Sequence, residues 1–166
     1  SSSLYAAQAA LFIAQQAVKA DDLERAAAAV QWVLDSGVEQ PLALLTRLRL
    51  ARVQLAQLSF GAALATASDA DSGVFKSAFA EVRGDALLAR AGAQSDASAG
   101  TVDVLAARAA YQVALDNLQQ EDASRGALLQ MKIDNLQPAP VIAAASVETV
   151  DSPVVATDTA VTEGEG

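Results

Sequence analysis

Three stretches of this chain repeat one arrangement of small and apolar residues, which predicts the same helix pair three times. The first helix of each pair carries a small residue at its expected crossing point, namely Ala14, Ala51 and Gly84, spaced 37 and 33 residues apart. The second helices carry matching small or apolar positions: Ala26, Val30 and Val33, then Ala63 and Ala67, then Ala107, Tyr111 and Ala114. Such a unit buries its apolar face only against neighbouring units, so the repetition predicts an open stack with a concave surface for a partner.

Alanine dominates the composition and favours closely packed helices. Of the 166 residues, 52% are hydrophobic and 40 are alanine, but only 4% are aromatic. Alanine has the highest intrinsic helix propensity, and its small side chain lets helix axes approach. A sandwich or barrel would need more β-branched and aromatic residues. The sequence therefore predicts an all-α solenoid of about three helix pairs with a C-terminal capping helix.

Residues that could carry out catalysis are scarce. The chain contains neither histidine nor cysteine. It therefore lacks the usual general base near neutral pH, thiolate metal ligands and the residue pairs of nucleophilic catalysis. Glu81 and Asp85 lie one helical turn apart, but no nucleophile or second acid pair accompanies them, and no glycine-rich nucleotide-binding string is present. We expect a non-enzymatic protein with no metal, cofactor or small-molecule substrate.

Charge is distributed unevenly along the chain. The net charge is −9, yet all eleven Lys and Arg residues precede position 133, and residues 137–166 carry five acidic residues and no basic one. This pattern lacks the basic surface that binds nucleic acid or anionic membranes. The longest uncharged run, 1–18, is shorter than the about 20 apolar residues of a membrane span. Because the chain begins at Ser1, we expect a fragment whose N-terminal anchor is absent here.

Helix and turn signals divide the chain into a helical domain, 1–136, and a disordered acidic tail with prolines, 137–166. Asp21 or Asp22 caps the second helix, Gly37 ends it, and Pro41 opens the third. The predicted helices are 4–19 with 22–36, 41–58 with 60–68, 74–91 with 102–118, and a last helix at 123–136.

Two further segments have distinctive patterns. The stretch 92–101 is small, polar and aperiodic, which predicts a loop inserted within the third pair. In the last helix, Leu129, Ile133 and Leu136 recur on one face, which predicts a cap packed on the preceding pair. We expect the opposite face of this helix to contact water through Gln130, Lys132 and Asp134.

Four strings of residues resemble a known family. They read RLRLARVQLA at 47–56, VRGDALLA at 82–89, AAYQVAL at 109–115 and LLQMKIDNL at 128–136. The spacing of the repeats is also close to the 34-residue period of tetratricopeptide repeats (TPR). Together these features resemble the periplasmic TPR domain of the ancillary SecYEG translocon subunit family, the YfgM-like proteins, over residues 4–136. The stretch 92–101 and the tail depart from that family's pattern.

The resemblance implies a protein-binding role beside the Sec translocon. It implies a full-length form with a short cytoplasmic N-terminus, one transmembrane helix and a repeat domain on the periplasmic side of the inner membrane of a Gram-negative bacterium. It further implies association with a membrane-anchored, prolyl-isomerase-like chaperone of the PpiD kind and transfer of emerging chains to periplasmic chaperones. Two alternatives remain: a helical homo-oligomerising module that pairs through 3–20, and a generic TPR adaptor unrelated to the translocon.

The TPR resemblance also implies a protein-binding groove along the first helices. Alignment on the three crossing residues places the following residues in it: Leu11, Gln15, Leu48, Arg52, Leu55, Glu81, Asp85 and Leu88. The alternative is that Arg52 pairs with Glu81 or Asp85 and fixes the stacking of adjacent repeats, a contribution of about 0–1 kcal/mol.

Two other features allow more than one interpretation. Arg47, Arg49 and Arg52 form either a solvated face or an anion site, and their helical spacing favours the solvated face. Trp32 either packs between repeats, as we expect, or serves as an exposed interface anchor.

Overall fold

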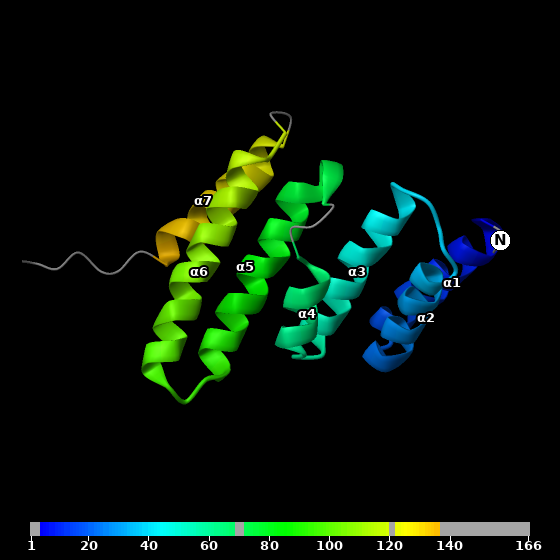
Figure 1. Cartoon of the computed structure of the whole chain (residues 1–166), viewed down its shortest axis with the longest axis horizontal. Coiled ribbons are helices and arrows are strands. Elements are labelled where there is room, and N and C mark those ends of the chain that lie inside the picture. Colours follow the sequence, from blue (N-terminus) through cyan, green and yellow to red (C-terminus); the bar gives the residue numbers. More distant parts are fainter. Residues whose placement is uncertain (1–3, 69–71, 120–121, 137–166) are drawn as a thin grey trace, which may run out of the picture.

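The fold is a row of antiparallel helices. The computed structural model describes residues 4–68, 72–119 and 122–136, and every regular element within these ranges is helical. Figure 1 shows the helices side by side, with α1 and α2 at one end and α6 and α7 at the other. The elements are α1 (Leu4–Lys19), α2 (Leu23–Asp35), α3 (Leu42–Ala56), α4 (Phe60–Thr66), a 3₁₀ turn (Gly73–Phe75), α5 (Lys76–Ala93), α6 (Ala97–Asp116) and α7 (Ala123–Asn135).

Local signals explain the first helix pair. The side chain of Asp22 caps α2 by accepting a 3.1 Å hydrogen bond from the backbone N–H of Arg25. Gly37 follows α2 with φ +73°, a left-handed conformation that glycine adopts without steric conflict. The chain then turns into α3, directly after Pro41. The predicted pair at 4–19 and 22–36 is therefore confirmed.

The small crossing residues pack where the sequence places them. Ala14 and Ala51 are buried, Ala14 beside Val30 of α2, and Gly84 is buried against Tyr111 of α6. The predicted anchors of the second helices are also buried. Close backbone approach at these points gives three consecutive helix pairs, α1–α2, α3–α4 and α5–α6, followed by α7. The all-α solenoid with a terminal helix is confirmed.

Buried residues form successive clusters between neighbouring helices. At the N-terminal end, Val33 packs with Ala7 and Ala10. A middle cluster joins the second pair to the third through Leu48 and Phe79. At the C-terminal end, six buried residues join the third pair to the last helix: Ala80, Ala107, Tyr111, Ala114, Leu129 and Ile133. The terminal helix thus covers the apolar side of the third pair, as predicted.

The predicted loop at 92–101 is wrong for most of its length. Residues 97–101 form the first turns of α6, and only the short segment after Ala93 connects the two helices. Asp96 caps α6 by accepting hydrogen bonds from the backbone N–H groups of Ser98 and Ala99, at 2.8 and 3.4 Å. The extra residues therefore lengthen the helical hairpin of the third pair.

Two remaining predictions concern the C-terminal tail and a membrane-spanning segment. The predicted tail at 137–166 lies outside the described residues. Across 4–68, 72–119 and 122–136, none of the helices combines the length and apolar character that a membrane crossing needs.

Candidate protein-binding groove

The predicted groove residues divide among separate places on the stack. Leu11 and Gln15 of α1 and Arg52 of α3 line one groove of about 690 Å³. Helix α2 contributes Leu23 and Val30 to its lining. The full lining is Gln8, Leu11, Phe12, Ala14, Gln15, Val18, Lys19, Leu23, Val30, Arg49, Arg52, Val53 and Ala56. We refer to this surface as the α1–α3 groove.

The α1–α3 groove combines apolar walls with positive charge. Most of its lining side chains are aliphatic, and Phe12 adds an aromatic ring that is 60% exposed. Three cations line it, Lys19, Arg49 and Arg52, and the lining contains no Asp or Glu. Its volume falls within the about 300–1,000 Å³ range of ligand sites. This chemistry suits an apolar segment that carries negative charge.

Two predicted groove residues on α3 do not line this groove. Leu48 is only 3% exposed and packs in the core with Ala51 and Phe79. Leu55 is half-buried and lies outside the lining. The structure therefore corrects the groove assignment of Leu48, which is a core residue that holds α3 against its neighbours.

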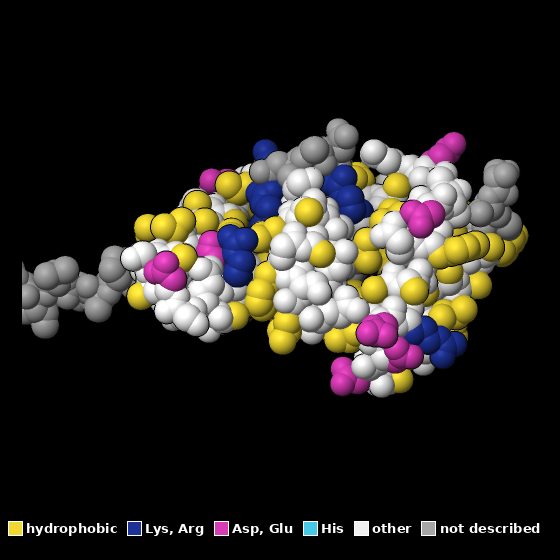
Figure 2. Space-filling model, turned by 60° about the horizontal axis from the view of Figure 1, so that its bottom comes forward, with side chains coloured by type: hydrophobic (Ala, Val, Ile, Leu, Met, Phe, Trp, Pro, Cys, Tyr) yellow, Lys and Arg dark blue, Asp and Glu magenta, His cyan; other side chains and the backbone are white. Residues whose placement is uncertain are grey.

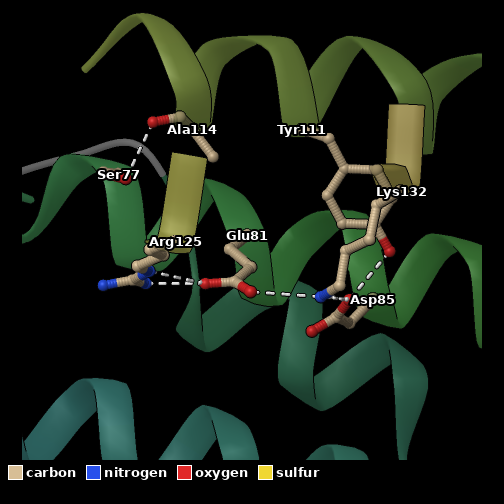
Figure 3. Close-up of polar contacts among 7 residues, drawn as sticks. All are labelled: Ser77, Glu81, Asp85, Tyr111, Ala114, Arg125 and Lys132. Atoms are coloured by element: carbon tan, nitrogen blue, oxygen red, sulfur yellow. Dashed lines mark hydrogen bonds and ion pairs between the residues drawn. The ribbon is translucent and has the colours of Figure 1, made fainter. Parts of the chain in front are cut away.

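The predicted acids Glu81 and Asp85 form a polar network with the last helix. Arg125 donates to Oε2 of Glu81 from Nη2 at 2.6 Å and from Nε at 3.2 Å. The Nζ atom of Lys132 lies 3.1 Å from Oε1 of Glu81 and 2.8 Å from Oδ1 of Asp85. The hydroxyl of Tyr111 also donates to Oδ1 of Asp85, at 2.7 Å, and Figure 3 shows these side chains converging.

This network corrects two sequence-based interpretations. Glu81 and Asp85 pair with cations of α7, so the alternative in which Arg52 pairs with either acid is wrong. The predicted exposure of Lys132 is also wrong, because its side chain is only 26% exposed and lies over the ring of Tyr111. Gln130 and Asp134 do remain exposed. The terminal helix thus pairs with both acids through its own cations.

Burial and pairing shift the pKa values in this network. Burial favours the neutral form of Glu81, but hydrogen bonds and charge from Arg125 and Lys132 outweigh it, so the pKa of Glu81 lies below its ordinary value. Burial lowers the pKa of Lys132, yet Asp85 and Glu81 raise it overall. Burial and the hydrogen bond to Asp85 raise the pKa of the Tyr111 phenol. All of these groups hold fixed charge states near neutral pH, which suits a structural role.

The last predicted groove residue lies elsewhere. Leu88 lines a second hollow of about 610 Å³, where the ends of α5, α6 and α7 meet and where Leu105 and Leu136 also contribute. Leu88 also packs against the buried cluster beneath α7. The eight predicted residues therefore do not form one continuous groove.

Other candidate residues are also placed by the structure. The Cζ atom of Arg47 lies 4.6 Å from the centroid of the Phe79 ring. Arg49 and Arg52 instead line the α1–α3 groove. Trp32 is 46% exposed, so the expectation of a fully packed side chain is wrong. Figure 2 shows hydrophobic side chains gathered on the surface at the α1–α2 end of the molecule.

Of the thirteen residues that line the α1–α3 groove, sequence reasoning assigned only Leu11, Gln15 and Arg52 to a groove and missed the other ten. Phe12, Lys19 and Arg49 are among the missed residues. The repeat alignment could have indicated two of them together, because Phe12 and Arg49 occupy equivalent positions when Ala14 is aligned with Ala51. Within the part of the chain that the structure describes, no cluster of three or more acidic side chains could hold a metal ion.

Comparison with known proteins agrees with this architecture. The tetratricopeptide repeat-like domain family matches residues 1–138. The ancillary SecYEG translocon subunit of Escherichia coli (strain K12) is 33% identical over 132 residues, which cover 80% of this chain and 58% of that protein. The chain thus spans somewhat more than half the length of this relative, and no solved structure matches it. The chain belongs to the tetratricopeptide repeat-like domain family and resembles the repeat domain of the ancillary SecYEG translocon subunit.

Proposed function

We propose that this chain is the partner-binding domain of a non-enzymatic subunit that acts beside the Sec translocon. Its longer form would be anchored by an N-terminal membrane helix, with the repeat domain on the periplasmic side of the inner membrane. There it would associate with a PpiD-like chaperone and help to pass translocated chains to periplasmic chaperones. The observation that carries the binding role is the α1–α3 groove, an apolar surface that no described element fills.

The support for this proposal comes from two independent directions. The relative is named as an ancillary translocon subunit, and a subunit of that kind must contact other proteins. The α1–α3 groove has the apolar character typical of peptide-binding clefts. The polar network on α5 and α7 offers no comparable surface, because its acids are already paired within the chain.

Crosslinking in native membranes tests the proposal. The membrane-anchored protein would carry either Arg52→Glu, inside the α1–α3 groove, or Lys76→Glu as an exposed control on α5. We expect Arg52→Glu to reduce crosslinks to translocon and chaperone components at least several-fold, while Lys76→Glu leaves them unchanged. Circular dichroism should show equal helical content. Unchanged crosslinking by Arg52→Glu would remove the groove from the proposal.

A homo-oligomerising module is the second candidate, because α1 exposes several large apolar side chains. Tyr5 is 82% exposed, and Leu4, Phe12 and Ile13 are also exposed. A second copy that covered this surface would remove apolar area from water. Light scattering over a dilution series separates the two functions: a mass that stays at one chain, near 17.0 kDa, excludes the oligomeriser.

A further inference from the structure

The cations of the α1–α3 groove differ from the paired cations of α5 and α7. Elsewhere, Arg90, Arg125 and Lys132 each form an ion pair with a carboxylate. For the three groove cations, Lys19, Arg49 and Arg52, the described residues supply no such ion pair. The concentration of positive charge is notable in a chain whose net charge is −9.

The positions of the polar residues define what an occupant must offer. Arg49 and Arg52 lie one turn apart on α3, so both can contact the same side of a bound segment. Lys19 lies in the last turn of α1 and marks one end of the opposite wall. Gln8 and Gln15, two turns apart on α1, add neutral hydrogen-bonding groups to that wall.

The apolar part of the lining limits the class of occupant further. Leu11, Val18, Val30 and Val53 present aliphatic side chains to the groove. A nucleic acid would need a broader basic surface, and the net negative charge of the chain opposes a long polyanion. A short segment with apolar side chains toward these aliphatic residues and carboxylates along its edges satisfies both parts of the lining.

We infer that the α1–α3 groove binds an amphipathic peptide segment of a partner protein in which Asp or Glu flank the apolar residues. This inference rests on the proposed function and specifies the chemistry of the partner. The apolar contacts provide most of the affinity, and the cations select the segment and its direction. Because the cations lie at a partly solvated rim, their contribution decreases as salt increases.

Two matched peptides test whether the groove prefers an acidic to a basic segment. Both are fluorescently labelled helices of about 15 residues with one Leu and Ala pattern, and their flanking positions carry Glu in one and Lys in the other. Anisotropy titrations against the whole chain measure each Kd. We expect the Glu peptide to bind about tenfold more tightly at low salt, with the preference shrinking as ionic strength rises.

Variants assign the preference to the groove. Arg52→Glu should abolish the preference for the Glu peptide and favour the Lys peptide, whereas Lys76→Glu should preserve the parent behaviour. Val18→Ser should weaken both peptides by a similar factor, since it changes the apolar lining of the groove without changing its charge. Circular dichroism confirms that each variant retains its helical content.

Each outcome either supports or overturns the inference. Equal affinity for the two peptides, or a preference that survives Arg52→Glu, overturns it. Tighter binding of a peptide made of residues 137–166, lost in Arg52→Glu, also overturns it, because the occupant would then be this chain itself. Selective binding of the Glu peptide with no translocon crosslinks would support the inference while contradicting the proposed function.

Discussion

Gly84 determines how closely α5 and α6 approach at the residue scale. A Cβ atom at this position would lie 2.6 Å from Cδ1 of Tyr111 and 2.9 Å from its Cζ. The ring of Tyr111 cannot easily move away, because it is only 1% exposed and its hydroxyl donates to Asp85. The sequence predicted a small crossing residue here, but the identity of its partner required the three-dimensional register of α5 and α6.

Substitution of Gly84 tests this close contact. We expect Gly84→Leu to destabilise the domain by about 1–3 kcal/mol, the usual range for overpacking, or to prevent folding altogether. Gly84→Ala should also lower the melting temperature, even though alanine favours a helix over glycine by about 1 kcal/mol. Gly92→Ala in the same helix is the control, because nothing lies within 4 Å of its added Cβ. A parent-like melting temperature for Gly84→Ala would contradict the contact.

The residue pattern also shows why the side chain of Lys132 was misplaced by sequence reasoning. Periodicity assigns Lys132 to the face opposite Leu129 and Ile133, where lysine would normally be solvated. Its long side chain instead reaches across to Asp85 and Glu81. A helical period predicts the direction of Cα–Cβ bonds but not which distant carboxylates lie within reach of a flexible chain.

At the element scale, ion pairs tie α7 to α5. Glu81 accepts from both Arg125 and Lys132, and its side chain is only 13% exposed. Its pKa is lower in the folded chain than its ordinary value of 4.5. Its contribution to the free energy of unfolding is therefore fully present above about pH 4.5 and disappears as the pH falls through the folded-state pKa.

A pH series with Glu81→Gln tests this contribution. We expect the substitution to lower stability by about 1–3 kcal/mol near pH 7, the range for losing a hydrogen-bonded charged group. The difference between variant and parent should narrow as the pH falls below 4.5, because the parent then loses the same charge. Thermal unfolding at each pH measures it, with the exposed Glu39→Gln as control. A difference that stays constant down to the acid limit would show that Glu81 does not act through its charge.

Helix α6 shows which helix boundaries could be predicted from the sequence. The polar, glycine-containing stretch at 92–101 has the composition of a loop, yet Asp96 caps a helix that begins inside it. Bidentate hydrogen bonds from Arg90 to Asp103, at 2.7 and 2.8 Å, hold the hairpin together near this point. The sequence contains the residue type expected for this cap, Asp96. The pairing of Arg90 with Asp103, in contrast, depends on how α5 and α6 are aligned. In the first pair, local caps alone were sufficient.

At the scale of the whole molecule, the groove depends on unequal spacing between first helices. The repeat pattern treats α1, α3 and α5 as equivalent, so it predicts one groove along all of them. In the structure α3 packs directly on α5, whereas the α1–α3 groove separates the first two. The repeats were therefore predictable, but the extent of the groove was not.

The serial arrangement of buried clusters predicts that the stack loses stability locally. Leu129→Ala should remove contacts beneath α7 and cost about 2–5 kcal/mol, whereas Val33→Ala perturbs the cluster at the N-terminal end of the stack. Because each pair contacts its neighbours, hydrogen exchange should accelerate most in α5–α7 for Leu129→Ala and in α1–α2 for Val33→Ala. Mass spectrometry of exchanged peptides measures both. Uniform acceleration throughout the chain in either variant would mean that the helix pairs unfold as one cooperative unit, contrary to nearest-neighbour coupling.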